Sequence, residues 1–120
     1  MIVAGFGFCR GVDIAALRAA LSLAQNGLAV TALATLRDKA PALAELAAAL
    51  DLPLIAVDAA AIRNLPTITQ SHASLAAYGV GSVAEAVALA AAGPGARLLA
   101  PRTISPDRTA TCAIAHGVCP

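Results

Sequence analysis

Short apolar stretches alternate with alanine- and leucine-rich helical patterns along this chain of 120 residues, and this alternation restricts the fold most. Strands that alternate with helices are typical of α/β domains, whose helices cover both faces of a sheet. We predict one domain over residues 1–120, a three-layer α/β/α sandwich with a mostly parallel sheet of about five strands and a C-terminal antiparallel hairpin. Predicted strands are 1–5, 28–34, 53–57, 97–100 and 109–115; predicted helices are 14–25, about 41–50, and 82–92.

Composition excludes several classes of protein. The net charge is +1 and aromatic residues make up 2% of the chain, so neither a basic surface field nor a base-stacking platform for nucleic acid is expected. The mean hydropathy is +0.79, but alanine supplies much of it, and charged residues interrupt every run long enough to span a bilayer. We find no signal peptide pattern, and three cysteines without framework spacing predict a reducing, cytoplasmic location. So apolar a chain is compatible with a homodimer.

The stretch Gly79-Val80-Gly81-Ser82-Val83-Ala84-Glu85-Ala86 joins a predicted loop to the clearest helix. Gly79 and Gly81 permit backbone turns that other residues resist, and Ser82 with Glu85 three residues later matches a capping box. One interpretation is that Glu85 only caps the helix. The other is that the glycine loop and the helix N-terminus hold an anionic ligand group.

A second glycine-rich stretch, Gly5-Phe6-Gly7-Phe8-Cys9-Arg10-Gly11, follows the first predicted strand. It stands where a dinucleotide-binding fingerprint would stand, with one residue more than the strict spacing. The acidic residue expected after the second strand is replaced by Thr35 and Leu36. We therefore favour a glycine loop that lets the backbone approach some other anionic ligand.

Cysteine and histidine provide weaker candidates. Cys9 is predicted near a helix N-terminus, which lowers a thiol pKa, but neither His72 nor His116 has a recognisable partner for a nucleophile and base pair. His116 and Cys119 are three residues apart, yet no second pair of ligands matches, so no metal site is predicted. Cys112 is most simply a small core residue.

Two cations are better candidates for ligand binding. Arg10 and Lys39 lie in loops that follow the first and second predicted strands. The carboxyl ends of parallel strands are where ligands gather in open α/β sheets, so three loops, 5–11, 35–39 and 79–82, should meet there. Arg binds a carboxylate with two parallel hydrogen bonds and Lys binds it as a point charge. The same two residues can also be solvated loop charges.

Four segments together resemble one family, that of CobE and the C-terminal domain of CbiG in cobalamin biosynthesis. The first segment is the opening Gly5–Gly11, and the second is Lys39 followed by a Pro-Ala-Leu helix and Leu52-Pro53-Leu54. The third is the stretch ending at Ala86, which is similar to the family's Gly-x-x-Ser-Val-Ala-Glu-Ala signature, and the fourth is the closing pair 98–102 and 109–115. The match covers nearly the whole chain in the same order. Two departures stand out: Lys39-Ala40-Pro41 leaves no room for an acidic residue that the family often has, and Arg102 replaces a lysine.

The resemblance implies a role in making the corrin ring, with a corrinoid or precorrin intermediate as ligand, other cobalamin-pathway enzymes as partners and no cofactor. The resemblance implies the following ligand-binding residues: Gly5, Gly7, Cys9, Arg10, Lys39, Gly79, Gly81, Ser82 and Glu85. Our leading hypothesis is a protein that binds an intermediate. The alternatives are a hydrolase that opens a precorrin lactone, for which no base is identified, and a nucleotide-binding α/β domain.

Overall fold

A computed structural model describes residues 1–63, 65, 67, 75 and 81–117. The elements in chain order are β1 (Ile2–Phe8), α1 (Ile14–Gln25), β2 (Ala32–Leu36), η1 (Arg37–Lys39), α2 (Ala40–Leu50), β3 (Leu54–Val57), α3 (Ala59–Ile62), α5 (Val83–Ala92), β4 (Arg97–Ile104) and β5 (Ala110–His116). The predicted helices 14–25, 41–50 and 82–92 are confirmed within one residue. No helix among these described residues is long and apolar enough to cross a membrane.

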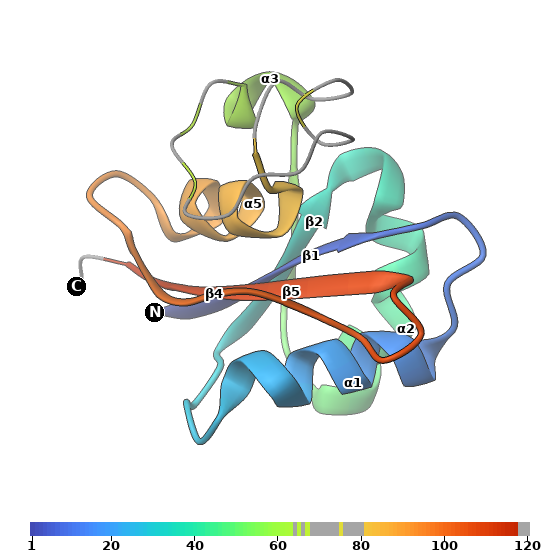
Figure 1. Cartoon of the computed structure of the whole chain (residues 1–120). Coiled ribbons are helices and arrows are strands. Elements are labelled where there is room, and N and C mark those ends of the chain that lie inside the picture. The colour runs from blue at the N-terminus through green and yellow to red at the C-terminus, as the bar shows by residue number, and fades with distance from the viewer. Residues whose placement is uncertain (64, 66, 68–74, 76–80, 118–120) are drawn as a thin grey trace.

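The five strands form one mixed sheet in the order β3-β2-β1-β5-β4. β1 pairs in parallel with β2, and β2 with β3, whereas β5 runs antiparallel to both β1 and β4. Figure 1 shows α1 and α2 on one face of the sheet and α3 and α5 on the other. The α/β fold, the five-stranded sheet and the C-terminal antiparallel hairpin are therefore confirmed.

Each face of the sheet has its own apolar core, because successive strand residues point to opposite faces. Ala4 and Phe6 of β1 face α1 and α2, and Val3 faces α5. β1 is covered on both sides, as its nearly uninterrupted apolar sequence predicts. Cys112 is fully buried in the α1 face, as expected of a small core residue, and this burial raises the pKa of its thiol.

Residues that favour helix ends stand at the ends of α1 and α2. The Asp13 carboxylate accepts a hydrogen bond from the Ala16 amide at 2.9 Å, which caps α1. Asn26 ends α1 in the left-handed conformation, with φ of 40°. Pro41 occupies the first turn of α2, where its missing N–H costs nothing.

Several predicted boundaries are wrong. β1 continues to Phe8, so Gly5 and Gly7 lie inside a strand and the predicted loop is shorter, beginning only at Cys9. β2 begins at Ala32 rather than at residue 28, and pairs there with Val3. β4 runs to Ile104 rather than ending at residue 100; Pro101 is tolerated because β4 is an edge strand. β5 ends at His116, one residue beyond the predicted end of the strand.

Candidate functional site

The carboxyl ends of β1 and β2 come together through Lys39. The 3-10 turn η1 follows β2 directly, and its last residue, Lys39, donates a hydrogen bond from Nζ to the Phe8 carbonyl oxygen at 2.7 Å. The same ammonium group lies 5.3 Å from the centroid of the Phe8 ring, a cation–π distance. The predicted meeting of the first two loops is confirmed, and Lys39 is held in place rather than free in solvent.

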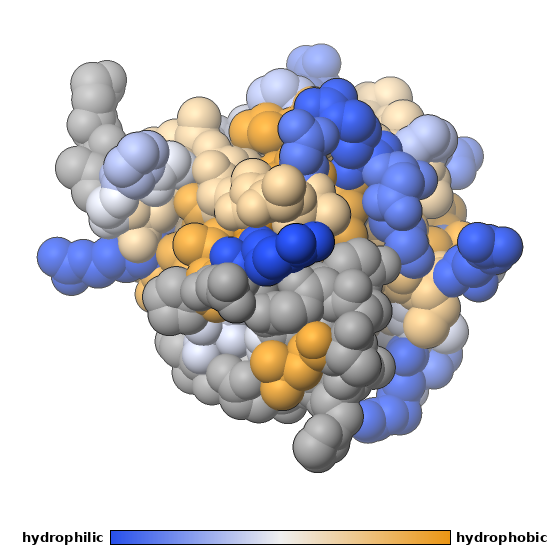
Figure 2. Space-filling view, turned by 90° about the horizontal axis from the view of Figure 1, so that it is seen from above, coloured by the Kyte–Doolittle hydropathy of each residue, from blue (hydrophilic) through white to orange (hydrophobic). Residues whose placement is uncertain are grey.

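Beyond Phe8 the chain turns toward α1 with its side chains exposed. The Cys9 amide donates to the Thr109 carbonyl at 2.9 Å, which ties the start of this turn to the β4–β5 hairpin. Gly11 has φ of +83°, a conformation that favours glycine. Cys9 and Arg10 are both exposed on this turn. Figure 1 shows it at the right of the molecule, and Figure 2, viewed from above, shows several hydrophilic residues along the same right-hand margin.

The third predicted segment reaches the same edge of the sheet through the first turn of α5. The Ser82 hydroxyl accepts a hydrogen bond from the Glu85 amide at 3.3 Å, so the predicted N-cap is confirmed. A Cβ atom built on Gly7 would lie 3.5 Å from the Val83 Cβ, which places this first turn over the end of β1. Gly81 is buried just before the cap. Gly79 lies outside the described residues.

Gly5 and Gly7 serve packing rather than a loop. A Cβ on Gly5 would come within 2.3 Å of the Ala84 carbonyl oxygen and 2.6 Å of the Ala88 nitrogen, so α5 lies directly on the backbone of β1. Neither glycine has a positive φ. The prediction that they form a glycine-rich loop is wrong. A dinucleotide fingerprint requires its glycines in a loop between a strand and a helix, and these two glycines lie within a strand. Their role as ligand contacts stays a prediction.

Glu85 is completely buried, and its carboxylate has a partner that the sequence did not indicate. Its Oε2 accepts a hydrogen bond from the main-chain N–H of Arg102 on β4 at 2.9 Å. The link spans 17 residues of sequence and joins the first turn of α5 to the edge strand. Glu85 is therefore more than a residue of a local capping box.

Two threonine hydroxyls, one on each strand that flanks β1, donate hydrogen bonds to the last carbonyls of β1. Thr35 Oγ1, buried on β2, donates to the Phe6 oxygen at 3.0 Å. Thr111 Oγ1 on β5 donates to the Gly7 oxygen at 3.0 Å. A polar residue in an otherwise apolar strand is the signal that marks both. Together with Lys39 they supply donors to three of the last carbonyls of β1 and stiffen that end of the strand.

The charges at this edge are nearly balanced. Arg37 pairs with Asp58 through Nε and Oδ1 at 2.6 Å, which links the ends of β2 and β3. Asp58 directly precedes α3, but its side chain makes no cap bond there. Asp13 is committed to its capping bond. Among the described residues of this edge, the cations without an acidic partner include Arg10, Lys39 and Arg108, which precedes Thr109 in the β4–β5 turn. Binding of an anion would depend on these individual cations, not on a broad basic field.

Metal and thiol chemistry gain no support here. Within the described part of the chain no cluster of three or more His, Cys, Asp or Glu side chains could hold a metal ion. Cys9 is exposed, and Cys112 is inert in the core. His72 and Cys119 lie outside the described residues, so the pairings considered for them are not tested.

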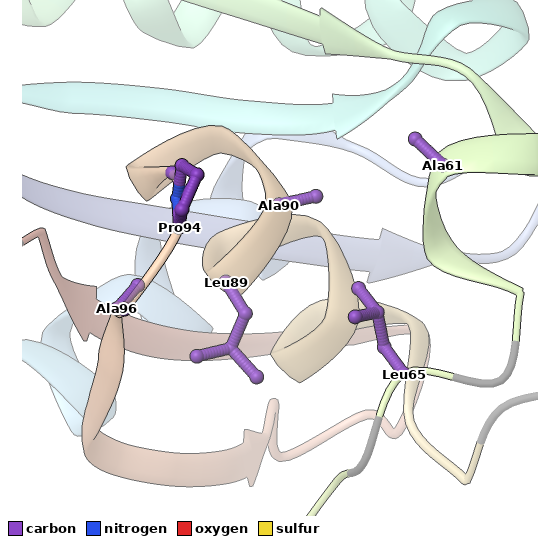
Figure 3. A pocket seen from close by; sticks show the side chains of 8 residues that line it. Ala61, Leu65, Leu89, Ala90, Pro94 and Ala96 are labelled. Atoms are coloured by element: carbon purple, nitrogen blue, oxygen red, sulfur yellow. The ribbon is translucent and has the colours of Figure 1, made fainter.

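A separate apolar depression of about 390 Å³ lies between α3 and the C-terminal half of α5. Figure 3 shows Ala61 and Leu65 on one side of it and Leu89, Ala90, Pro94 and Ala96 on the other. None of the predicted site residues that the structure describes lines it. Its described lining has no polar or charged side chain that could orient a carboxylate ligand.

Fold and geometry define a class: an open α/β domain in which the loops that follow β1 and β2 meet through Lys39 and Phe8. Comparison with known proteins gives the family. Residues 2–115 match the family model described as cobalamin synthesis G C-terminus. The chain belongs to this family of cobalamin biosynthesis proteins.

Solved structures of cobalamin biosynthesis proteins are similar to this chain. CobE, a protein from the cobalamin (vitamin B12) biosynthetic pathway, is 32% identical with a TM-score of 0.84; the match covers 96% of this chain and 89% of CobE. The cobalamin biosynthesis protein chiG from Agrobacterium tumefaciens str. C58 is 36% identical over 99% of this chain and 100% of that one, with a TM-score of 0.74. A putative cobalamin biosynthesis protein G homolog from Sulfolobus solfataricus shares the fold, with 20% identity and a TM-score of 0.73 over 95% of this chain and 36% of that longer one. A search of curated protein sequences gives no match.

Proposed function

We propose that this protein binds a corrinoid or precorrin intermediate of cobalamin biosynthesis at the carboxyl ends of β1 and β2. Such intermediates carry acetate and propionate carboxylates around an apolar macrocycle. They require cations held at defined positions beside apolar surface. The family membership and the location of the cations support the proposal.

The observation that carries the proposal is the position of Lys39. A hydrogen bond to the Phe8 carbonyl uses one of the three N–H donors of its ammonium group, and the Phe8 ring lies beside it. The remaining donors can bind a carboxylate while the ring contacts an apolar part of the ligand. Arg10, two residues beyond Phe8, supplies an exposed guanidinium that can bind a second carboxylate with two parallel bonds.

An absorbance titration of the purified protein with hydrogenobyrinic acid tests the proposal. We expect a saturable spectral shift with the pigment recovered unchanged. Arg10→Ala and Lys39→Ala should each weaken binding roughly tenfold, the loss typical of one charge-assisted hydrogen bond. Arg18→Ala is the matched control, because it removes the same charge from an exposed position on α1.

The other outcomes are equally informative. A shift followed by a new pigment species would replace binding with the hydrolase alternative. Thermal stabilisation by NAD or ATP, without any response to corrinoids, would favour a nucleotide-binding domain. Unchanged affinity in both Arg10→Ala and Lys39→Ala would show that the carboxylates are bound elsewhere.

A further inference from the structure

The edge strand β4 is irregular near its middle. Leu98 pairs with Ala115, Ala100 with Ile114 and Thr103 with Cys112, so one extra residue is inserted in β4 on each side of Ala100. Bulges bend a strand and turn main-chain groups away from the ladder, and they recur beside functional sites. Arg102 lies in the second irregular segment, next to the exposed Pro101.

Both faces of the sheet anchor this irregular segment. On one face Thr103 Oγ1 lies 3.1 Å from the Ala20 carbonyl oxygen of α1 and 3.2 Å from the Cys112 carbonyl oxygen of β5. On the other face the Arg102 N–H donates to Glu85 at 2.9 Å. The main chain at Arg102 is therefore tied to the first turn of α5, and the next residue, Thr103, is tied to α1.

A buried carboxylate is a costly way to join a helix to a strand. Glu85 has none of its surface exposed, although an apolar residue at its position would pack without losing solvation. In some proteins a buried polar group of this kind fixes one arrangement among several of similar packing energy. Here the arrangement that Glu85 fixes is the position of Arg102 relative to the first turn of α5.

The guanidinium group of Arg102 is available for a ligand. It is half-buried, yet it makes no hydrogen bond or ion pair with any residue that the structure describes. The first turn of α5 contacts Gly7 of β1 and, through Glu85, Arg102 of β4. Figure 1 shows α5 lying above these strands. Arg102 therefore approaches the candidate site from the side opposite β2.

We propose that Arg102 is a further ligand-contacting residue, which binds a carboxylate group of the tetrapyrrole-derived ligand, and that Glu85 is its positioning residue. This inference rests on the proposed function. It adds a cation from β4 to those that follow β1 and β2. The ligand would then be held at separate points of its periphery, as a rigid macrocycle with several carboxylates requires.

The test is the hydrogenobyrinic acid titration, applied to matched variants. We expect Arg102→Ala to raise the Kd for hydrogenobyrinic acid roughly tenfold. In about 0.5 M salt the ratio of the two Kd values, Arg102→Ala over the unmodified protein, should become smaller, because salt screens an ion pair. Arg97→Ala is the control, since it removes the same charge from an exposed position on the same strand. It should leave the Kd within about twofold of the unmodified value.

A double-variant cycle tests the positioning role. Glu85→Gln retains an oxygen that accepts from the Arg102 amide, so binding should persist. Glu85→Ala should raise the Kd about as much as Arg102→Ala, and should add no further loss in the Arg102→Ala background. A merely structural Glu85 would instead add its own loss there. If Glu85→Ala fails to fold, the cycle is run with Glu85→Leu, which fills the same volume.

The remaining results overturn the inference in distinguishable ways. An Arg102→Ala protein with the affinity of Arg97→Ala would refute the role of Arg102 and leave the proposed function standing. Additive losses in the cycle would refute the positioning role of Glu85. If the unmodified protein binds no corrinoid, both the proposed function and this inference fail.

Discussion

Gly5→Ala is the substitution for which the structure makes the sharpest prediction. Gly5 lies in the middle of β1, where α5 crosses the strand. The new Cβ would lie 2.3 Å from the Ala84 oxygen and 2.6 Å from the Ala88 nitrogen, both main-chain atoms of α5. Ordinary contact needs about 3.5 Å, so α5 must retreat by roughly 1 Å.

The clash outweighs the usual benefit of replacing glycine. Removing backbone freedom from the unfolded chain stabilises a protein by about 0.4–1 kcal/mol. A 1 Å retreat weakens the dispersion contacts of a buried interface by up to roughly half, and overpacking a core commonly costs about 1–3 kcal/mol. Because the obstacle is helix backbone rather than a mobile side chain, we expect a net loss near the upper end, about 2 kcal/mol.

Urea unfolding followed by circular dichroism measures this loss, and the thermal midpoint should fall by roughly 8 °C. Gly7→Ala is the matched control. Its Cβ would meet the Thr111 hydroxyl, which rotates about one side-chain bond, at 3.0 Å, and the Val83 Cβ at 3.5 Å, an ordinary contact distance. Its loss should stay below about 1 kcal/mol. Equal midpoints for the two variants, or a Gly5→Ala protein as stable as the unmodified one, would refute the close packing of α5 on β1.

The other predictions concern single contacts. Thr111→Val removes the donor to the Gly7 carbonyl and should cost about 1 kcal/mol in urea unfolding; no loss would mean that water replaces the hydroxyl. Arg37→Ala breaks the exposed ion pair with Asp58 and should cost less than about 1 kcal/mol, so a larger loss would show a structural role at the β2–β3 edge. Hydrogen bonds from Ser105 and Thr109 hold the pKa of Asp107 below its ordinary value of 3.8. A lowered folded-state pKa means that the Asp107 contribution to stability is present above pH 3.8 and is lost as the pH falls through the folded-state pKa. The thermal midpoint should therefore fall less between pH 7 and pH 3 in Asp107→Asn than in the unmodified protein. An equal fall in both proteins would show that the Asp107 carboxylate does not contribute to stability.

The sequence by itself predicted the elements and their arrangement in layers. Helix α1 and helix α5 follow from apolar residues at helical spacing, from the caps Asp13 and Ser82, and from the glycines that follow each helix. These signals act within a few residues of chain, so they can be read without knowing the fold. The resemblance of four segments to one family was likewise visible, and the family model matches residues 2–115.

Tertiary structure alone decided the roles of the residues at the candidate site. The same glycines that predict a loop in sequence are, in the sheet, the places where α5 approaches β1. Lys39 finds its partner 31 residues away on Phe8, and Glu85 finds Arg102 through a bulge on an edge strand. Such pairings arise because packing brings distant backbone groups to buried side chains that need hydrogen-bond partners, and no local pattern specifies which groups those will be.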